Sequence, residues 1–277
     1  MVAGGEFALD GRSGTVQIPA IYVISLASAA QRRAFMRRQL DPLGLPYKFF
    51  DAVHGAQNPG YYLFKKYNDK ERIRRRGKGA SLRLSQLGCF ASHYLLWEKC
   101  MRENVPIIIL EDDAALLPPF VQFCGHAARF VHEYGFVWLQ PSRKIANQTG
   151  LQLGKIGPFS VRKFAKGFSG TTGYLISPEI ARTLINYCSE WIYPVDNTLD
   201  RFYEHNVEAI GIDPVCIVQD DDLESFINVA DSGRKRSLID TLRRECANLV
   251  DSSRRIRHNL TFSMRHKRAK RSSQSES

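Results

Sequence analysis

The sequence predicts an α/β fold, and three observations support this prediction. A strand, a helix and a second strand follow one another between Val16 and Val53, as at the start of a βαβ unit. The run Ile107–Leu110 is wholly apolar, as expected for a central strand covered on both faces. A further strand, turn and helix follow after Gly170. With 277 residues, the chain is long enough to bury the core of one large domain or two small ones.

The first βαβ unit can be followed in order. Val16–Leu26 is rich in β-branched residues and predicts a buried strand. The next segment, "SAAQRRAFMRRQL", predicts a helix with Ser28 as its N-cap, which Pro42 and Gly44 end. Tyr47–Val53 predicts the second strand, which ends in an acidic residue.

The middle of the chain combines a charged segment with a strongly periodic one. Gln57–Ala80 has many charges and no apolar periodicity, so we predict a mobile surface loop. From Ser85 to Arg102, apolar residues recur every three or four positions, which predicts a helix. Pro106 then precedes the strand Ile107–Leu110.

The later elements have clear start signals. Gly135–Gln140 predicts a strand. In "GTTGYLISPEIARTLINYC", a strand turns into a helix with Ser177 as N-cap and Pro178 at the first helical position. Val207–Gln219 supplies a late strand, and the chain becomes basic and Ser-rich from Asp231, which predicts a helix followed by a disordered tail.

These elements predict three regions. Residues 1–15 form a leader that we expect to be disordered, residues 16–230 form the folded domain, and residues 231–277 form the basic C-terminal helix and tail. The longest apolar run is too short to span a bilayer, and the leader lacks the basic start of a signal peptide.

The net charge of +11 is concentrated in two segments. Gly60–Ala80 carries +6 and Arg234–Arg271 carries +10, so the rest of the chain is mildly acidic. Neither segment lies in a recognisable DNA- or RNA-binding module, and we expect no nucleic-acid partner. The basic tail also contains Ile256, Leu260, Phe262 and Met264, which suits a peripheral anchor on an anionic membrane, although a solvated tail is the plainer alternative.

Six scattered cysteines form no CxxC pair, which favours buried thiols in a reducing compartment and argues against a thiolate zinc site. The sequence also lacks a GxGxxG motif, a Walker loop and a Gly-x-Ser-x-Gly motif.

The acidic triplet Glu111–Asp113 follows a buried strand directly. Ligands of α/β proteins bind outside the carboxyl ends of strands, and neighbouring carboxylates can share one Mg²⁺ or Mn²⁺ ion. If strand geometry persisted, Glu111 and Asp113 would point to one side and Asp112 to the other. Solvated loop acids, or caps of the following helix, are the alternative.

Three other groups allow two interpretations each. His93 lies among apolar residues and is either a core histidine or a phosphate contact. The small residues Gly170–Tyr174 suit either a plain turn or close approach of the backbone to a sugar. Asp196 and Asp200 are four residues apart, on one face if helical, and each is either a general base or a helix cap.

Taken in order, several segments resemble one known family. "YVISLASAAQRRAFMRRQLDPLGLPYKFFDAVHG", "LSQLGCFASHYLLWEKC", "IIILEDDAAL", "GTTGYLISPEIARTLI" and "PVD" resemble glycosyltransferase family 25, the bacterial lipooligosaccharide glycosyltransferases, which is related to collagen galactosyltransferases. The resemblance covers about Tyr22 to Ile227 and is nearest to bacterial β-galactosyltransferases. One position departs from it: Gln86 stands where the family commonly has a glutamate.

This resemblance implies a single GT-A-like domain with a Rossmann-like mixed, mainly parallel sheet. It implies an inverting hexose transfer from a UDP-sugar, UDP-galactose being favoured, to a lipooligosaccharide acceptor, with Mn²⁺ or Mg²⁺ as cofactor. The expected location is cytoplasmic, on the inner face of the bacterial cytoplasmic membrane.

The resemblance also assigns residues. The metal and diphosphate would be held by Glu111, Asp112 and Asp113, and the diphosphate also by His93. The nucleotide would lie on Ser25, Leu26 and Arg33. The residues expected near the donor sugar are Gly170, Thr171, Thr172, Gly173 and Tyr174. Asp196, with Asp200 in reserve, is the expected catalytic base.

Two rival functions are also compatible with the sequence. A metal-dependent phosphohydrolase would use the triplet to release phosphate from a nucleotide sugar without an acceptor. A non-enzymatic basic protein would bind membranes or nucleic acid with a steep salt dependence and without the triplet.

Overall fold

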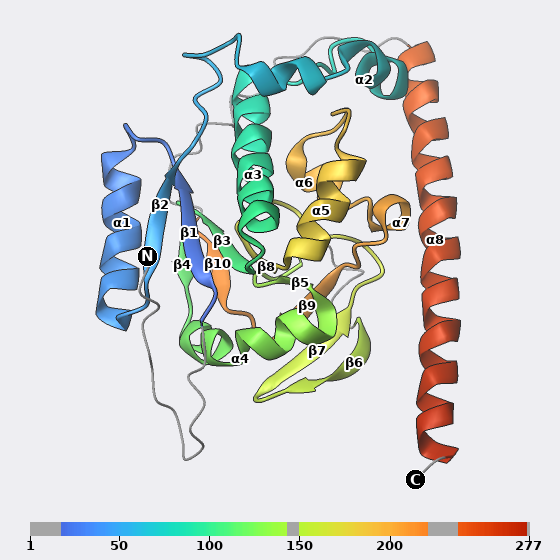
Figure 1. Cartoon of the computed structure of the whole chain (residues 1–277). Helices are drawn as coiled ribbons and strands as arrows, with labels where there is room; N and C mark the ends of the chain where they lie inside the picture. The colour runs from blue at the N-terminus through green and yellow to red at the C-terminus, as the bar shows by residue number, and fades with distance from the viewer. Residues whose placement is uncertain (1–17, 143–149, 221–237, 276–277) are drawn as a thin grey trace.

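The computed structural model describes residues 18–142, 150–220 and 238–275. An eight-stranded mixed sheet forms the centre, helices cover both of its faces, and one long helix, α8, stands along an edge (Figure 1). The strands of the sheet are β1 (Ala20–Ser25), β2 (Tyr47–Asp51), β3 (Ile107–Glu111), β5 (Phe136–Trp138), β6 (Leu151–Ile156), β7 (Phe159–Lys163), β8 (Gly173–Ile176) and β9 (Ile210–Asp213). β4 (Ala114–Leu116) and β10 (Ile217–Gln219) form a separate antiparallel pair.

Helices connect and cover these strands. They are α1 (Ala30–Leu40), α2 (Asp69–Arg76), α3 (Leu84–Glu103), α4 (Pro119–Tyr134), α5 (Pro178–Tyr187), α6 (Val195–Leu199), α7 (Phe202–His205) and α8 (Leu238–Ser275), with 3₁₀ turns η1 (Asp41–Leu43) and η2 (Tyr62–Lys66).

The strand order is β2-β1-β3-β8-β5-β9-β7-β6. Parallel pairing is confined to β2-β1-β3 and to β5 with β9, and the other neighbours are antiparallel. The predicted mixed α/β sheet is therefore confirmed, but it is partly rather than mainly parallel. β1 lies between β2 and β3, so the chain reverses its direction of travel across the sheet at β1, where α/β proteins bind ligands.

Each face of the sheet has its own core. α3, α5, α6 and α7 pack on one face, and α1 and α4 pack on the other. The two cores share β3, because its side chains alternate: Ile107 and Ile109 face one core, and Ile108 and Leu110 face the other. All four are fully buried, which confirms the prediction of a central strand.

Two predicted helix starts have different outcomes. The Ser177 hydroxyl accepts a hydrogen bond from the Ile180 N–H at 3.3 Å, which confirms it as the N-cap of α5. The prediction for Ser28 was wrong. The N-cap of α1 is Ala29, one residue later, and no side chain caps the helix. Gly44 ends that segment as predicted, with φ +61° after η1.

The predicted loop Gln57–Ala80 contains regular structure, which corrects the sequence interpretation. η2 and α2 lie within it, and the Asn68 side chain caps α2 by accepting the Glu71 N–H at 2.9 Å. Arg74 and Arg75 pair with Glu71. These capping and ion-pair contacts replace an apolar stripe, and the periodicity argument therefore missed the helix.

Two further elements differ from expectation. The late strand Val207–Gln219 is two strands, β9 and β10, separated by a cis Asp213–Pro214 bond. The expected disordered tail is helical, because α8 continues to Ser275. The predicted leader, residues 1–15, lies outside the described residues.

Candidate active site

A pocket of about 280 Å³ opens at the carboxyl ends of β1, β2 and β3. The register brings these ends together, because Ser25 pairs with Asp51 and Ile24 with Glu111. Six residues assigned to the donor or metal from the sequence line this pocket, namely Ser25, Leu26, His93, Glu111, Asp112 and Asp113. The predicted location of the site is thus where the sheet topology places a cavity.

Arg33 supports the pocket from outside, although we expected it to line the nucleotide. Its guanidinium donates to the Ser25 carbonyl at 3.0 Å and to the Leu26 carbonyl at 3.1 Å, and it pairs with Asp51. Arg33 is not one of the described residues that line the cavity. It holds the end of β1 against the end of β2.

The three acids of the triplet do not alternate as strand residues. β3 ends at Glu111, Asp112 and Asp113 form a turn, and β4 begins at Ala114 to pair with β10. All three carboxylates line the same pocket. The expectation that Asp112 points to the opposite side was wrong, because the strand geometry stops one residue too early.

Asp112 is held by an arginine that the sequence interpretation missed. Nη1 of Arg32 donates to Oδ1 of Asp112 at 2.7 Å. Both side chains are largely buried, so water screens this pair less than a surface pair. Only the packing of α1 against β1 and β4 brings these residues together, since they are far apart in the chain.

Asp113 is the least compensated of the three acids. Its Oδ2 accepts a hydrogen bond from Gln219 at 3.1 Å, whereas its Oδ1 is buried and has no hydrogen-bond partner among the residues that the structure describes. Burial and the charge of Glu111 raise the pKa of Asp113 to about 7, although Arg32 opposes the shift. A buried carboxylate oxygen without a donor suits a bound cation.

Glu111 has the opposite environment. Its carboxylate accepts hydrogen bonds from His93 at 3.2 Å and from the Thr171 hydroxyl, and its backbone N–H donates to the Thr172 carbonyl at 2.9 Å. Burial acts to raise the pKa of Glu111, but the hydrogen bonds from His93 and Thr171 hold it below its ordinary value. Glu111 is therefore an anion in the pocket.

A directional chain of hydrogen bonds orients His93. The Trp97 indole N–H can only donate, and it donates to the Tyr174 hydroxyl at 2.8 Å. Tyr174 then directs its own proton to Nδ1 of His93, 2.9 Å away. From this arrangement we assign a proton to Nε2 of His93, from which it is donated to Glu111.

Replacing Tyr174 with phenylalanine tests this chain. The change removes the hydroxyl to which the Trp97 N–H and the Nδ1 atom of His93 are hydrogen-bonded. Both groups are fully buried, so water cannot replace it. We expect the free energy of unfolding to fall by about 1–3 kcal/mol, measured by urea denaturation. In the matched variant Tyr62→Phe, the hydroxyl lies on an exposed side chain, and a change within about 0.5 kcal/mol is expected. Equal losses in both variants would contradict the assignment.

Cys89, which the sequence interpretation left as a structural thiol, joins this group. Ligand atoms of Cys89, His93 and Glu111 lie within 4.8 Å of one another, so these residues form a possible metal-binding group. However, burial and the nearby carboxylates raise the pKa of the Cys89 thiol well above its ordinary value, and Nε2 of His93 carries the proton donated to Glu111. The hard oxygen ligands of the triplet suit Mg²⁺ or Mn²⁺ better.

The segment Gly170–Tyr174 supports the triplet through hydrogen bonds to Glu111. Gln140 donates to the Ser169 carbonyl at 2.8 Å and accepts the Gly173 N–H at 3.0 Å, which holds this turn in place. Gly170 has φ +76°, a conformation that favours glycine. None of the described residues that line the pocket comes from this segment, although Thr171 contacts Glu111.

The structure separates the two candidate bases. Asp196 is half-buried on α6, and its charge, with those of the triplet, contributes to the raised pKa of the Cys89 thiol. Asp200 turns toward another loop, where a Cβ on Gly167 would lie 1.8 Å from its Oδ1. Asp196 thus lies in the electrostatic environment of the pocket, and Asp200 packs against Gly167.

Comparisons with known proteins identify one family. The family model described as glycosyltransferase family 25 (LPS biosynthesis protein) matches residues 18–199. The lipooligosaccharide biosynthesis protein lic2B of Haemophilus influenzae is 31% identical over 177 residues, which cover 59% of this chain and 61% of that protein. The lacto-N-neotetraose biosynthesis glycosyltransferase LgtE of Neisseria meningitidis serogroup B is 26% identical over 221 residues, 75% of this chain and 76% of that protein.

A relative from an animal shows that the similarity extends beyond bacteria. A glycosyltransferase 25 family member of Aedes aegypti is 28% identical over 199 residues, which are 67% of this chain but only 31% of the mosquito protein. The chain thus spans less than two thirds of the length of lic2B and of the mosquito protein. The family model nevertheless covers more than half of the chain and every residue that lines the carboxylate pocket, and the chain therefore belongs to glycosyltransferase family 25.

Proposed function

We propose that this chain transfers a hexose, with galactose favoured, from a UDP-sugar to the core of a lipooligosaccharide or lipopolysaccharide, with inversion at the anomeric carbon. The observation that carries the proposal is the pocket at the ends of β1, β2 and β3, where three carboxylates meet and one of them has a buried oxygen without a donor in the described structure. Membership of glycosyltransferase family 25 makes sugar transfer the chemistry expected there.

The residues present fit a divalent cation. Asp113 would hold it with its buried Oδ1, together with Asp112 or Glu111. When bound, such an ion would neutralise negative charge on the departing nucleotide diphosphate. Burial and the charge of Glu111 together raise the pKa of Asp113, and a cation would relieve the repulsion between these carboxylates.

The remaining groups orient the carboxylates and take the proton from the acceptor. Arg32 orients Asp112 through their ion pair, and the hydrogen bonds from His93 and Thr171 orient Glu111. Asp196 is the proposed general base, which takes the proton of the acceptor hydroxyl as that oxygen attacks the sugar. The field that its charge exerts near the pocket supports Asp196 over Asp200.

The names of the relatives support the proposed acceptor and location. Lic2B is named for lipooligosaccharide biosynthesis and LgtE for lacto-N-neotetraose biosynthesis. An acceptor of this class is linked to lipid, so we place the enzyme at the inner face of the cytoplasmic membrane, with the basic C-terminal segment toward the bilayer. In the described part of the chain, no helix is long and apolar enough to span a membrane.

Calorimetry with a panel of nucleotide sugars tests the proposal. In the presence of Mn²⁺, we expect a UDP-hexose to bind and to raise the melting temperature, and the bound sugar to be transferred to purified lipooligosaccharide. Chelation of the metal should abolish both effects. If no UDP-sugar binds, or if phosphate is released equally well without an acceptor, the proposed transfer is wrong and a phosphohydrolase is indicated.

A further inference from the structure

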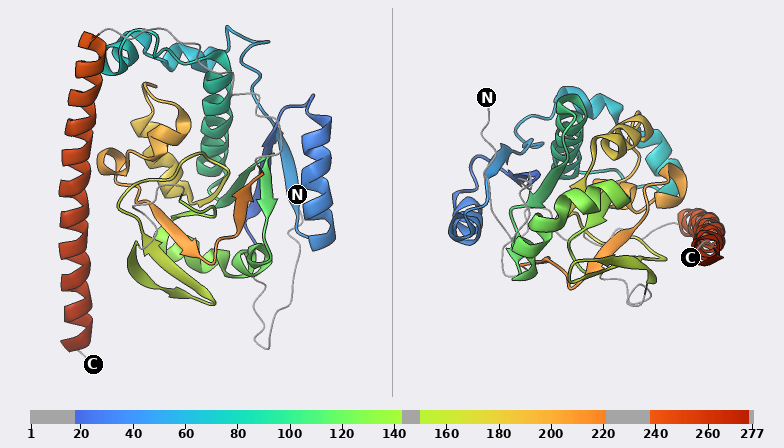
Figure 2. Two further views of the ribbon diagram at one scale, coloured as in Figure 1. Left: turned by 180° about the vertical axis from the view of Figure 1, so that it is seen from behind. Right: turned by 60° about the horizontal axis from the view of Figure 1, so that its bottom comes forward.

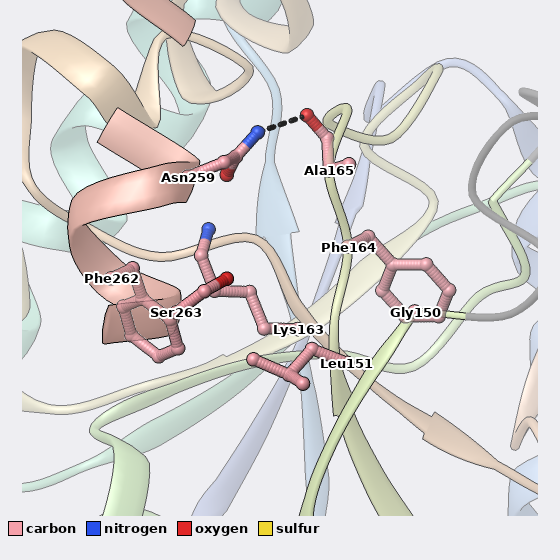
Figure 3. Close-up of a pocket in the computed structure, with 8 residues that line it drawn as sticks. All are labelled: Gly150, Leu151, Lys163, Phe164, Ala165, Asn259, Phe262 and Ser263. Atoms are coloured by element: carbon pink, nitrogen blue, oxygen red, sulfur yellow. Dashed lines mark hydrogen bonds between the residues drawn. The ribbon is translucent and has the colours of Figure 1, made fainter. Parts of the chain in front are cut away.

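The long helix α8 turns its polar side toward the protein. Asp251 accepts hydrogen bonds from Arg201 at 2.6 Å and 2.9 Å. His258 contacts Glu208 at 2.7 Å, and Asn259 donates to the Ala165 carbonyl at 2.9 Å (Figure 3). Phe262 is the one large apolar side chain drawn in that close-up from α8, beside Lys163.

The opposite side of α8 is apolar and exposed. Leu249, Ile256, Leu260 and Met264 are 70%, 60%, 60% and 57% exposed. At about 100° per residue, these four side chains fall within a sector of about 80°. We call them the α8 stripe. Asp251 and His258, which contact the protein, lie on the other side of the same helical wheel.

This orientation is the reverse of what a surface helix normally has. A helix that packs on a globular protein buries its apolar stripe and exposes its polar face. α8 contacts α2 and α7 at the edge of the molecule remote from α1, and its outer side faces away from the sheet (Figures 1 and 2). An exposed apolar stripe of this kind marks an interaction surface.

The charges around the α8 stripe indicate the chemistry of the partner. Four exposed cations lie within or beside it, namely Arg257, Lys267, Arg268 and Lys270, whereas Arg254 pairs with Glu204 of the protein body. Over residues 244–270, Glu245 is the one acid with an exposed side chain, since Asp251 pairs with Arg76 and Arg201. The outer side is therefore apolar along its centre and cationic at its margins, which is the pattern of helices that lie in the interface of anionic membranes.

A second copy of the chain fits this surface poorly. Pairing two α8 helices would bring their cations together, and like charges repel. If Leu249 and Ile256 are taken as successive a positions of a heptad, the corresponding d positions are Ser252 and Asn259, and neither would fill a coiled-coil seam.

We propose that α8 lies flat on an anionic lipid surface, with the α8 stripe in the boundary between headgroups and acyl chains and the flanking cations on lipid phosphates. The α8 stripe runs from Leu249 to Met264, so the contact would be about 22 Å long. The role of this docking, which is to bring the pocket to a lipid-linked acceptor, rests on the proposed function. The binding of α8 to lipid is argued from the helix alone.

Vesicle flotation with the full chain tests this docking. We compare vesicles of phosphatidylcholine with vesicles of phosphatidylcholine and phosphatidylglycerol in equal parts. The wild type should bind the anionic vesicles at least about tenfold more tightly, and high salt should weaken that binding. In the double variant Ile256→Glu, Leu260→Glu, that binding should fall by at least about tenfold. The matched control Val105→Glu, Val121→Glu adds the same charge at exposed apolar residues of the body and should bind like the wild type.

The outcomes separate the alternatives. If the stripe variant binds anionic vesicles as well as the wild type, or if neutral and anionic vesicles bind equally, the docking proposal is wrong. If light scattering shows a wild-type dimer that the stripe variant dissociates, a second copy occupies the surface instead. Calorimetry with the UDP-hexose is run on the same samples: its failure beside normal flotation would overturn the proposed function alone, and loss of flotation beside normal UDP-hexose binding would overturn the docking alone. Equal urea midpoints would show that the variants are folded.

Discussion

Replacing Asp113 with asparagine is expected to lower kcat/KM for sugar transfer at least about a thousandfold, which corresponds to about 4 kcal/mol of transition-state stabilisation. The change keeps the size of the side chain and removes its charge. Asp113 is the carboxylate whose buried Oδ1 has no donor in the described structure, and it is the strongest candidate to hold a cation. Its neighbours are already engaged, Asp112 with Arg32 and Glu111 with His93.

Stability distinguishes loss of function from loss of fold in this variant. The Asp113→Asn change removes one of several like charges in a buried place, so we expect the free energy of unfolding to stay the same or to rise. Glu133→Gln on α4 is the matched control, because it removes the same charge from a surface ion pair with Arg129. Transfer within about tenfold of wild type in Asp113→Asn would contradict the assigned role.

The second large effect is expected from Gly88→Ala in α3. A Cβ at Gly88 would lie 2.3 Å from the Val53 carbonyl oxygen and 2.9 Å from the Gly55 nitrogen. Both neighbours are backbone atoms of the pocket wall, and Ser92 holds that wall by accepting the Val53 N–H at 2.9 Å. In an isolated helix the same change would stabilise by about 0.5–1 kcal/mol.

At Gly88, the close packing against backbone outweighs this gain in helix propensity. We expect the free energy of unfolding to fall by about 3 kcal/mol, because overpacking against backbone forces the chain to shift. The displaced wall should also weaken UDP-hexose binding at least about tenfold, measured by calorimetry. Gly60→Ala is the control, since a Cβ there meets no atom within 4 Å. The close-packing argument is refuted if Gly88→Ala is as stable as that control.

Local patterns predicted most of the fold. The strand–helix–strand start, the helix α3, the buried strand β3 and the capped helix α5 follow from spacing and start signals within one segment. The 57–80 segment failed because α2 is stabilised by the Asn68 cap and by pairs of Glu71 with Arg74 and Arg75. The sequence also failed to predict the full length of α8. The contacts of this helix with the protein are mostly polar, so its sequence has no apolar stripe of the kind that a buried face would require.

The sequence by itself determined the order of the elements, the family, and the acidic triplet at the end of a buried strand, because each depends on residues adjacent in the chain. Only the tertiary structure decided what each carboxylate does. Arg32 is 80 residues from Asp112, Gln219 is 106 residues from Asp113, and Tyr174 is 81 residues from His93. Likewise, only the docking of α8 through Asp251, His258 and Asn259 decided that its apolar side faces outward. Partners so distant in sequence meet through the packing of the sheet and helices, which spacing along the chain does not encode.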